Sequence, residues 1–352
     1  MKKRKCNVIV IGPHPDGLGG ISRVVKIWEE NGVLKAPGIL YLSTVADGHQ
    51  NRVLFLAKAL IRFTELLFAG VKCVYIHTSS KRSFYRKSIF IFLSAIFQKQ
   101  IILHIHPTHF YNFIVKSKRI IRWYIKFTLG LVDRFAVLTE KMKSKMMTLF
   151  PTTPTFVIPN PINSKLMVNS SAWKRSEKFL LYLGWYIKEK GVYDLVDAVE
   201  ILIRKGYDLQ LKMYGTKKVE KLRRYVNSKD LKRAVEINGW ISREDKIRAF
   251  YECTLLILPS YSEGIPNVIL EAMATQTPII STAVGGLEEI LRDNENAVIA
   301  PVKDSQKLSE AIVRCLTNSQ LRNRIAKQAY EDALSNFDIG IVKERFYHIV
   351  SI

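Results

Sequence analysis

Short apolar runs alternate with amphipathic stretches along this chain, and this alternation restricts the fold more than any other feature. Five runs in the first half are expected to be strands: residues 7–11, 73–77, 101–106, 134–138 and 155–158. The amphipathic stretches between them lie near residues 53–69, 84–97 and 113–130. Strands that alternate with helices predict an α/β fold with a parallel, doubly wound sheet.

The second half repeats the alternation and predicts a second sheet of the same kind. Its expected strands are residues 179–183, 209–214, 235–238, 255–258 and 278–281. Its expected helices are residues 192–205, one from 219, 243–251, 267–274, one behind Gly285-Gly286, and two closing helices from about 305. Residues 159–178 read as a connection. We therefore expect domains at 1–165 and 166–336, with a C-terminal helix of about 337–352 that can pack back on the first.

Positive charge is concentrated in the first half of the chain. Residues 1–165 hold 26 basic and 7 acidic residues, a net +19, whereas residues 166–352 hold 28 and 24, a net +4. This asymmetry favours a polyanionic or membrane-surface partner over a merely solvated face. A basic nucleic-acid-binding protein is an alternative, but no RNP-type aromatic motif, zinc finger or helix-turn-helix accompanies the charge, so no nucleic-acid partner is expected.

The cysteines and the apolar runs indicate where in the cell the protein is expected to lie. Cys6, Cys73, Cys253 and Cys315 lie far apart and form no CxxC pair, which predicts neither disulfides nor a zinc site and favours a cytoplasmic location. The longest apolar run, residues 89–97, is about half of the roughly 20 residues needed to cross a bilayer. We therefore expect no membrane-spanning segment and no cleaved signal peptide.

One loop carries most of the chemistry that the sequence offers. Residues 259–267 follow an expected strand and read Pro-Ser-Tyr-Ser-Glu-Gly-Ile-Pro-Asn. Ligands of parallel sheets bind beyond the carboxyl ends of the strands. Gly264 permits close backbone approach, and the helix that Pro266 introduces presents free N–H groups to an anion. Glu263 and Glu271 can each accept hydrogen bonds from a diol, so this loop predicts a nucleotide-sugar site.

This loop resembles the Glu-x7-Glu motif of retaining glycosyltransferases of the family-four type. Four other segments resemble family motifs in the same order: a glycine loop at Gly19-Gly20-Ile21, the domain link Ile158-Pro159-Asn160, a phosphate-binding segment from Gly184 to Val192, and a second glycine loop at residues 284–290. The resemblance extends along almost the whole chain. It implies the GT-B fold, in which two Rossmann-like domains face each other across a cleft.

The resemblance also implies roles for individual residues. Glu263 would hold the hydroxyls of the donor sugar and Glu271 the ribose, while Lys190 would neutralise the departing diphosphate. The implied catalytic residues are Glu263, Lys190 and His106. The implied donor-binding residues are Gly19, Gly20, Gly184, Lys188, Gly264, Ile265, Pro266, Asn267 and Glu271. A retaining transfer depends chiefly on stabilising charge on the leaving phosphate.

The sequence departs from the family pattern at two places. Trp185 stands where the family often has a phosphate-clamping arginine; Lys188 could supply the charge, but an ammonium is not a bidentate fork, and Trp185 could equally be a packing residue. Pro107 follows His106 where the family usually has glycine. The pair His104-x-His106 also raises metal ligation, but the sequence offers no third ligand of suitable spacing, so no metal is expected.

The implied function is transfer of a sugar from a UDP- or GDP-linked donor to a hydroxyl of a lipid-linked or other glycan, as in bacterial capsule, O-antigen or exopolysaccharide synthesis. No cofactor or metal beyond the donor is expected. Basic amphipathic stretches at residues 52–68 and 116–131 make an anionic membrane surface a candidate partner, with the protein peripheral at the inner face of the cytoplasmic membrane. A nucleotide-sugar epimerase of the same fold remains an alternative; it would need further catalytic carboxylates, and the first half has few.

Overall fold

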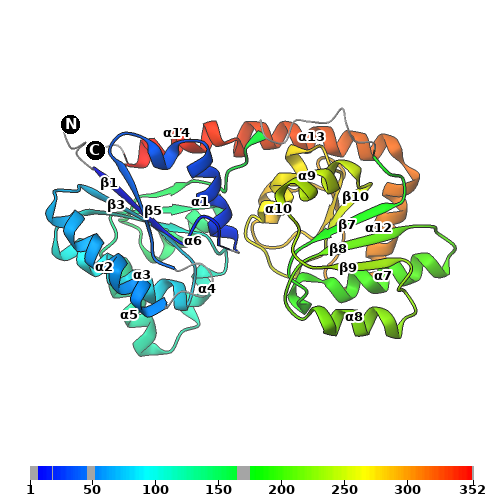
Figure 1. The fold of residues 1–352 in the computed structure, drawn as a ribbon, viewed down its shortest axis with the longest axis horizontal. Coiled ribbons are helices and arrows are strands. Elements are labelled where there is room, and N and C mark those ends of the chain that lie inside the picture. The colour runs from blue at the N-terminus through cyan, green and yellow to red at the C-terminus, as the bar shows by residue number, and fades with distance from the viewer. Residues whose placement is uncertain (1–6, 18, 46–51, 165–174, 351–352) are drawn as a thin grey trace. The chain divides into compact units, whose positions relative to one another are not determined.

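The computed structural model describes residues 7–17, 19–45, 52–164 and 175–350 (Figure 1). The contacts divide the chain into two units. Unit 1 comprises Met1–Pro161 with Ile339–Ile352, and unit 2 comprises Ile162–Asp338. Each unit contains a six-stranded parallel sheet with flanking helices, so the predicted α/β class is confirmed.

The sheet of unit 1 has the strand order β2-β1-β3-β4-β5-β6. Its strands are β1 (Val8–Gly12), β2 (Ile39–Ser43), β3 (Cys73–Thr78), β4 (Gln100–Ile105), β5 (Arg134–Val137) and β6 (Thr155–Val157). Strands β1 and β3 are buried along their whole length, as expected where helices cover both faces of a parallel sheet. The edge strand β2 is only half-buried, and the sequence analysis missed it.

Helices cover both faces of this sheet. They are α1 (Gly20–Glu30), the 3-10 turn η1 (Val33–Lys35), α2 (Arg52–Phe68), α3 (Arg82–Ile96), α4 (Phe110–Val115), α5 (Arg119–Gly130), α6 (Glu140–Leu149) and α14 (Ile339–Val350). Helix α3 contacts both α2 and α5 (Figure 1). Helix α14 packs on α1, with the Phe346 ring 4.6 Å from that of Trp28. The single amphipathic stretch expected at 113–130 is two helices, α4 and α5.

The sheet of unit 2 has the order β12-β11-β10-β7-β8-β9. Its strands are β7 (Phe179–Leu183), β8 (Gln210–Tyr214), β9 (Val235–Asn238), β10 (Leu255–Leu258), β11 (Ile279–Ser281) and β12 (Val298–Ile299). Its helices are η4 (Lys188–Lys190), α7 (Val192–Arg204), α8 (Val219–Ser228), α9 (Arg243–Glu252), α10 (Asn267–Ala274), α11 (Leu287–Ile290), α12 (Ser305–Thr317) and α13 (Ser319–Phe337). Because β10 lies between β7 and β11, the loops that follow these three strands leave the same edge of the sheet.

Glycine lets these loops approach one another backbone to backbone. Gly191, at φ 66°, lies where a Cβ atom would meet the Pro259 carbonyl oxygen at 2.0 Å. A Cβ at Gly286 would meet the Gly264 carbonyl oxygen at 2.4 Å. Neither position has room for a side chain, so the loops after β7 and β11 are held against the loop after β10.

The three cysteines that the structure describes are buried and unpaired: Cys73, Cys253 and Cys315. Burial raises the pKa of each thiol to about 12. They therefore stay protonated at neutral pH and behave as small core residues rather than nucleophiles.

Candidate active site

The carboxylate of Glu263 forms a buried ion pair in the loop between β10 and α10. The residue is 8% exposed. Its Oε1 accepts hydrogen bonds from Lys190 Nζ at 2.6 Å and from Ser260 Oγ at 2.6 Å. Lys190 ends η4 after β7, and β7 pairs directly with β10. The structure thus brings together two of the predicted site residues, which lie 73 positions apart.

The second carboxylate of the motif is also buried and paired. Glu271 lies in α10 and is 3% exposed. Lys246 Nζ, on α9, donates to both of its oxygens, at 2.7 and 2.9 Å. The sequence analysis missed Lys246, because it stands 25 residues before Glu271 in a stretch with no recognisable motif. It treated both glutamates as open to a ligand and predicted neither ion pair.

The residues between the two glutamates form the expected loop-to-helix transition. Helix α10 begins at Asn267 as predicted, with Pro266 in the extended conformation at its N-cap. Ile265 is buried, and Gly264 supplies the carbonyl that meets Gly286. The first N–H groups of α10, at the positive end of the helix dipole, therefore follow Glu263 closely in the sequence.

The segment after β7 contains the remaining predicted phosphate contacts. Gly184 is tightly enclosed: a Cβ at Gly215 would lie 1.8 Å from its carbonyl oxygen. Trp185 is partly exposed, and Lys217 Nζ lies 3.1 Å from the centre of its ring. Lys188 is exposed at the start of η4. The indole face is thus occupied by a cation from the neighbouring loop.

Three predicted site residues belong to unit 1 rather than unit 2. Gly19 and Gly20 begin α1 behind β1, and His106 follows β4. Gly19 has an extended backbone, and a Cβ there would meet nothing within 4 Å, so its conformation and packing do not demand glycine. Both segments lie at the carboxyl edge of the sheet, where parallel sheets bind ligands.

His106 belongs to a buried cluster of three histidines. Its Nδ1 lies 3.3 Å from Asn160 Oδ1, and its Nε2 lies 2.9 Å from Nδ1 of His77. His104 Nδ1 lies 2.9 Å from the hydroxyl of Tyr75. Burial lowers the pKa of His106 to about 4 and that of His77 and His104 well below the ordinary value, so all three rings are neutral at pH 7. The sequence analysis found no third partner for His104 and His106; the fold supplies His77 from the neighbouring strand.

A buried lysine, Lys87, lies at the carboxyl edge of the unit 1 sheet. Lys87 on α3 donates from Nζ to Thr44 Oγ1 and lies 3.4 Å from the Gly12 carbonyl oxygen. Burial lowers its pKa well below the ordinary value. Its contacts lie at the carboxyl ends of β1 and β2. The sequence analysis read this helix only as an amphipathic cover of the sheet and did not single out Lys87.

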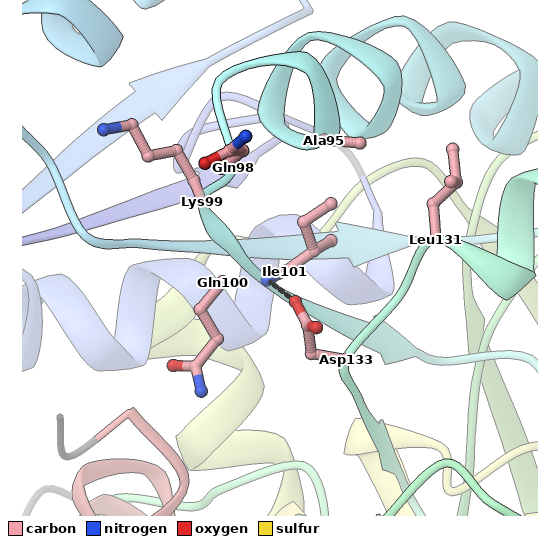
Figure 2. A pocket seen from close by; sticks show the side chains of 7 residues that line it. All are labelled: Ala95, Gln98, Lys99, Gln100, Ile101, Leu131 and Asp133. Atoms are coloured by element: carbon pink, nitrogen blue, oxygen red, sulfur yellow. Dashed lines mark hydrogen bonds between the residues drawn. The ribbon is translucent and has the colours of Figure 1, made fainter.

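A hollow of about 430 Å³ lies elsewhere in unit 1 (Figure 2). Its lining is Ala95, Gln98, Lys99, Gln100, Ile101, Leu131 and Asp133. These residues lie at the amino ends of β4 and β5, opposite to the edge where the predicted site residues gather. Asp133 Oδ2 accepts the N–H of Ile101 at 2.7 Å and so anchors the strand. None of the predicted site residues lines this hollow.

Comparison with known proteins finds a family match within unit 2. Residues 164–332 match the family model described as "Glycosyl transferases group 1". The chain is similar to an uncharacterised glycosyltransferase of Methanocaldococcus jannaschii (28% identical, 60% of this chain, 57% of the relative). It is similar to the putative teichuronic acid biosynthesis glycosyltransferase TuaC of Bacillus subtilis (28%, 49%, 41%) and to phosphatidyl-myo-inositol mannosyltransferase of Mycobacterium leprae (27%, 54%, 52%). The chain spans about half the length of these curated relatives.

Solved structures show the same fold. Sucrose-phosphate synthase of Thermosynechococcus elongatus superimposes with a TM-score of 0.79, at 19% identity, over 98% of both chains. Anabaena HepE, in complex with UDP, superimposes with a TM-score of 0.74, at 16% identity, over 98% of this chain and 99% of that one. At such identities the likeness shows the fold alone, and it confirms the expected GT-B fold.

We expect the change Lys246→Met to destabilise unit 2, because it leaves a buried carboxylate without this cation. Breaking a buried ion pair costs about 3–5 kcal/mol, and the partial exposure of Lys246 reduces the expected cost to roughly 1–3 kcal/mol. Urea unfolding monitored by circular dichroism measures the difference. The exposed Lys232→Met is the matched control and should change stability by less than about 0.5 kcal/mol. Adding Glu271→Gln to Lys246→Met should restore part of the loss; equal stability of the Lys246 and Lys232 variants would contradict the expectation.

Proposed function

Because residues 164–332 form a glycosyltransferase group 1 domain, we propose that this protein is a retaining glycosyltransferase. It transfers a sugar from a nucleoside diphosphate sugar to a hydroxyl of a glycan in bacterial capsule, O-antigen or exopolysaccharide synthesis. The observation that carries the proposal is the Lys190–Glu263 pair directly before the N-terminus of α10. It combines an acceptor for sugar hydroxyls with positive charge for a diphosphate, within the matched domain.

The two buried glutamates divide the donor between them. Glu263 accepts hydrogen bonds from hydroxyls of the transferred sugar, and Glu271 accepts them from the ribose. An ionised carboxylate only accepts hydrogen bonds, so a donor hydroxyl would bind each of them as a hydrogen-bond donor while the lysine supplies the positive charge. The backbone at Gly264 and Ile265, Gly184, and the first residues of α10 complete the donor site. The UDP bound by Anabaena HepE supports a uridine donor, and a GDP-linked donor is the alternative.

The main requirement of the reaction is to stabilise the negative charge that develops on the leaving diphosphate. The side chain of Lys190 is 23% exposed, so its ammonium stays accessible while Glu263 fixes its position. The N-terminus of α10 adds a second positive end. With this charge in place, transfer requires no metal ion. His106, the third predicted catalytic residue, is a neutral ring whose two nitrogens already contact Asn160 and His77, so it is given no step in the proposed transfer.

Replacing either glutamate should weaken donor use. Glu263→Gln and Glu271→Gln each lose a charged acceptor worth about 1.5–3 kcal/mol, which corresponds to roughly ten- to a hundredfold in transfer rate at low donor concentration. A panel of nucleoside diphosphate sugars, screened by thermal stabilisation, identifies the donor for this assay. NMR of the product reports whether the anomeric configuration is retained. Wild-type transfer by both variants would overturn the site assignment, and a free epimerised donor as product would favour an epimerase.

Lys190→Ala should lower kcat more than it raises KM, because only interactions that strengthen in the transition state accelerate the chemical step. We expect a loss of roughly a hundredfold or more in kcat, as for other groups that stabilise developing negative charge. The double change with Glu263→Gln separates the two possible causes. If the loss came only from the stranded carboxylate, the double variant would have the kcat of Glu263→Gln alone; if the ammonium acts on the diphosphate, the kcat of the double variant will be lower than that. Lys205→Ala, exposed after α7, is the control.

We also propose that unit 1 docks on an anionic membrane, where a lipid-linked acceptor is presented. Helix α5 is apolar on two sides: Ile125 and Leu129 are buried, whereas Ile120 and Trp123 are 82% and 65% exposed. Trp123 and Phe127 stack at 5.5 Å. The inward side of α5 packs on α3 and α4, and this packing does not account for the outward Ile120 and Trp123. An exposed apolar face with basic neighbours is typical of an interfacial helix.

The other features of the unit agree with this placement. The exposed basic residues on and before α5 are Lys116, Lys118, Arg119, Arg122 and Lys126. Ile61 and Phe68 on α2 are exposed as well. Among the described residues, no helix combines the length and hydropathy needed to cross a membrane. The name of the Mycobacterium leprae relative includes a phospholipid acceptor, which supports a lipid-linked acceptor for this chain.

Binding to vesicles should rise with anionic lipid content and fall with salt, because the attraction is screened over a Debye length of about 10 Å at 0.1 M. Replacing Lys116, Lys118, Arg119 and Arg122 by Gln should weaken binding, at about 1 kcal/mol per residue near the surface. The matched control replaces Lys205, Lys232, Arg233 and Lys327 of unit 2 and removes the same charge. Sedimentation with vesicles measures both. Equal losses in the two variants would show that net charge, not this helix, attracts the membrane.

A further inference from the structure

Three histidines meet at the carboxyl edge of the unit 1 sheet. His77 on β3 pairs in register with His104 on β4, and His106 follows two residues later. All three side chains are buried, at 1%, 0% and 8% exposed. One nitrogen from each ring lies within 4.8 Å of the other two. The ring centres of His104 and His106 are 4.2 Å apart.

Oxygen acceptors determine which nitrogens carry protons. His104 Nε2 lies 3.0 Å from the Ile158 carbonyl oxygen, so this nitrogen donates and Nδ1 keeps its lone pair. His106 Nδ1 lies 3.3 Å from Asn160 Oδ1, so it donates there and Nε2 keeps the lone pair. His77 Nδ1 donates to that Nε2. The remaining lone pair, on His77 Nε2, is buried and has no hydrogen-bond partner among the described residues.

We propose that His77, His104 and His106 bind a divalent transition-metal ion of the zinc class. Neutral imidazole is the metal-binding form of histidine, and these buried rings are held neutral. His104 would bind through Nδ1 and His106 through Nε2. Their other nitrogens already donate to Ile158 and Asn160, the outer-shell arrangement typical of metal-ligating histidines. The inference does not depend on the proposed transferase activity.

The chemistry of the set selects the ion. Three imidazoles without a carboxylate or thiolate suit Zn²⁺, Co²⁺, Ni²⁺ or Cu²⁺ and disfavour Mg²⁺ and Ca²⁺. Zn–N bonds of about 2.0–2.1 Å in a tetrahedral site place ligating nitrogens about 3.3 Å apart. The ligating nitrogens must therefore approach one another by up to about 1.5 Å when the ion binds. Tyr75 would give up its hydrogen bond to His104 Nδ1, and His77 would give up its hydrogen bond to His106 Nε2. Because all three rings are already neutral, binding releases no net proton.

The ion would join β3 to β4 and would leave the Lys190–Glu263 pair of unit 2 untouched. It is therefore assigned no step of sugar transfer. Its expected effect is on unit 1, whose cluster would exchange an unsatisfied buried lone pair for a metal bond. A ligand that binds only the folded state raises the melting temperature in proportion to the logarithm of its concentration.

The test is a Co²⁺ titration of the full chain, without a histidine tag and stripped with chelator. We expect one equivalent to bind with the visible absorption bands of nitrogen-coordinated Co²⁺, and Zn²⁺ to displace it. Zn²⁺ should raise the melting temperature and EDTA should reverse the rise. Absence of Co²⁺ and Zn²⁺ binding at micromolar concentration would overturn the proposal.

Variants localise the ion. His77→Gln and His104→Gln should each weaken Co²⁺ binding by at least tenfold. The control is His109→Gln, which should leave binding unchanged; His109 follows β4 and is hydrogen-bonded to Ser80. Asn160→Ala keeps all three ligands and should weaken binding about 10–100-fold, which protects the test against misfolding of the ligand variants. Unchanged Co²⁺ binding in the His77, His104 and Asn160 variants would place the ion elsewhere and overturn the proposal. Loss of transfer activity in EDTA would instead contradict the metal-free reaction and leave this site standing.

Discussion

The arrangement of the candidate site depends on close backbone contacts between loops of unit 2. The loop after β10 is flanked by Gly191 on one side and Gly286 on the other, each too near a carbonyl oxygen to carry a side chain. A side chain at either glycine would push apart two loops that follow different strands. The separation between Lys190 and Glu263 is therefore set by the backbone and the sheet order, and the ion pair forms within a framework that already exists.

The two ion pairs have more meaning for function than for stability. A buried pair gains little over apolar residues of similar volume, since desolvation offsets the attraction, but losing one partner is costly. Glu263 and Glu271 are each bound by a lysine from another element, Lys190 and Lys246. In the proposed donor site, this arrangement would allow two carboxylates to stay buried close to a bound diphosphate. Without the lysines, their negative charges would repel the proposed donor.

Much of the fold could be predicted from the sequence, because the inner strands and the helices have strong periodic signals. Strands β7, β9 and β10 and helix α10 have the bounds that the sequence predicted. The edge strand β2 was missed because it is only half-buried, and β12 was missed because it has only two residues. The break between α4 and α5 was also missed, since apolar and basic residues continue across it.

The site was predicted in part, for a related reason. Glu263, Glu271 and Lys190 stand in local motifs that a sequence shows directly. Lys246 and His77 stand in no motif, and their contacts arise from the packing of α9 against α10 and from the register of β3 with β4. Residues brought together only by sheet order leave no local signal. A single sequence therefore shows the residues that stand in motifs but not Lys246 and His77, which neighbouring elements bring to them.

The positive charge of the chain is divided unequally between the same two units. The net +19 of residues 1–165 belongs almost entirely to unit 1, which also carries the outward aromatics of α5, whereas the remainder of the chain is near neutral. Under the proposed function, unit 2 needs only a few positioned cations, because the proposed donor is small and would be held at short range by paired side chains. A surface that attracts a membrane acts over about 10 Å and depends on summed charge rather than on the position of each residue. Local pairing in one unit and summed charge in the other are thus the arrangements expected for a soluble, anionic donor and for an acceptor presented at a lipid surface.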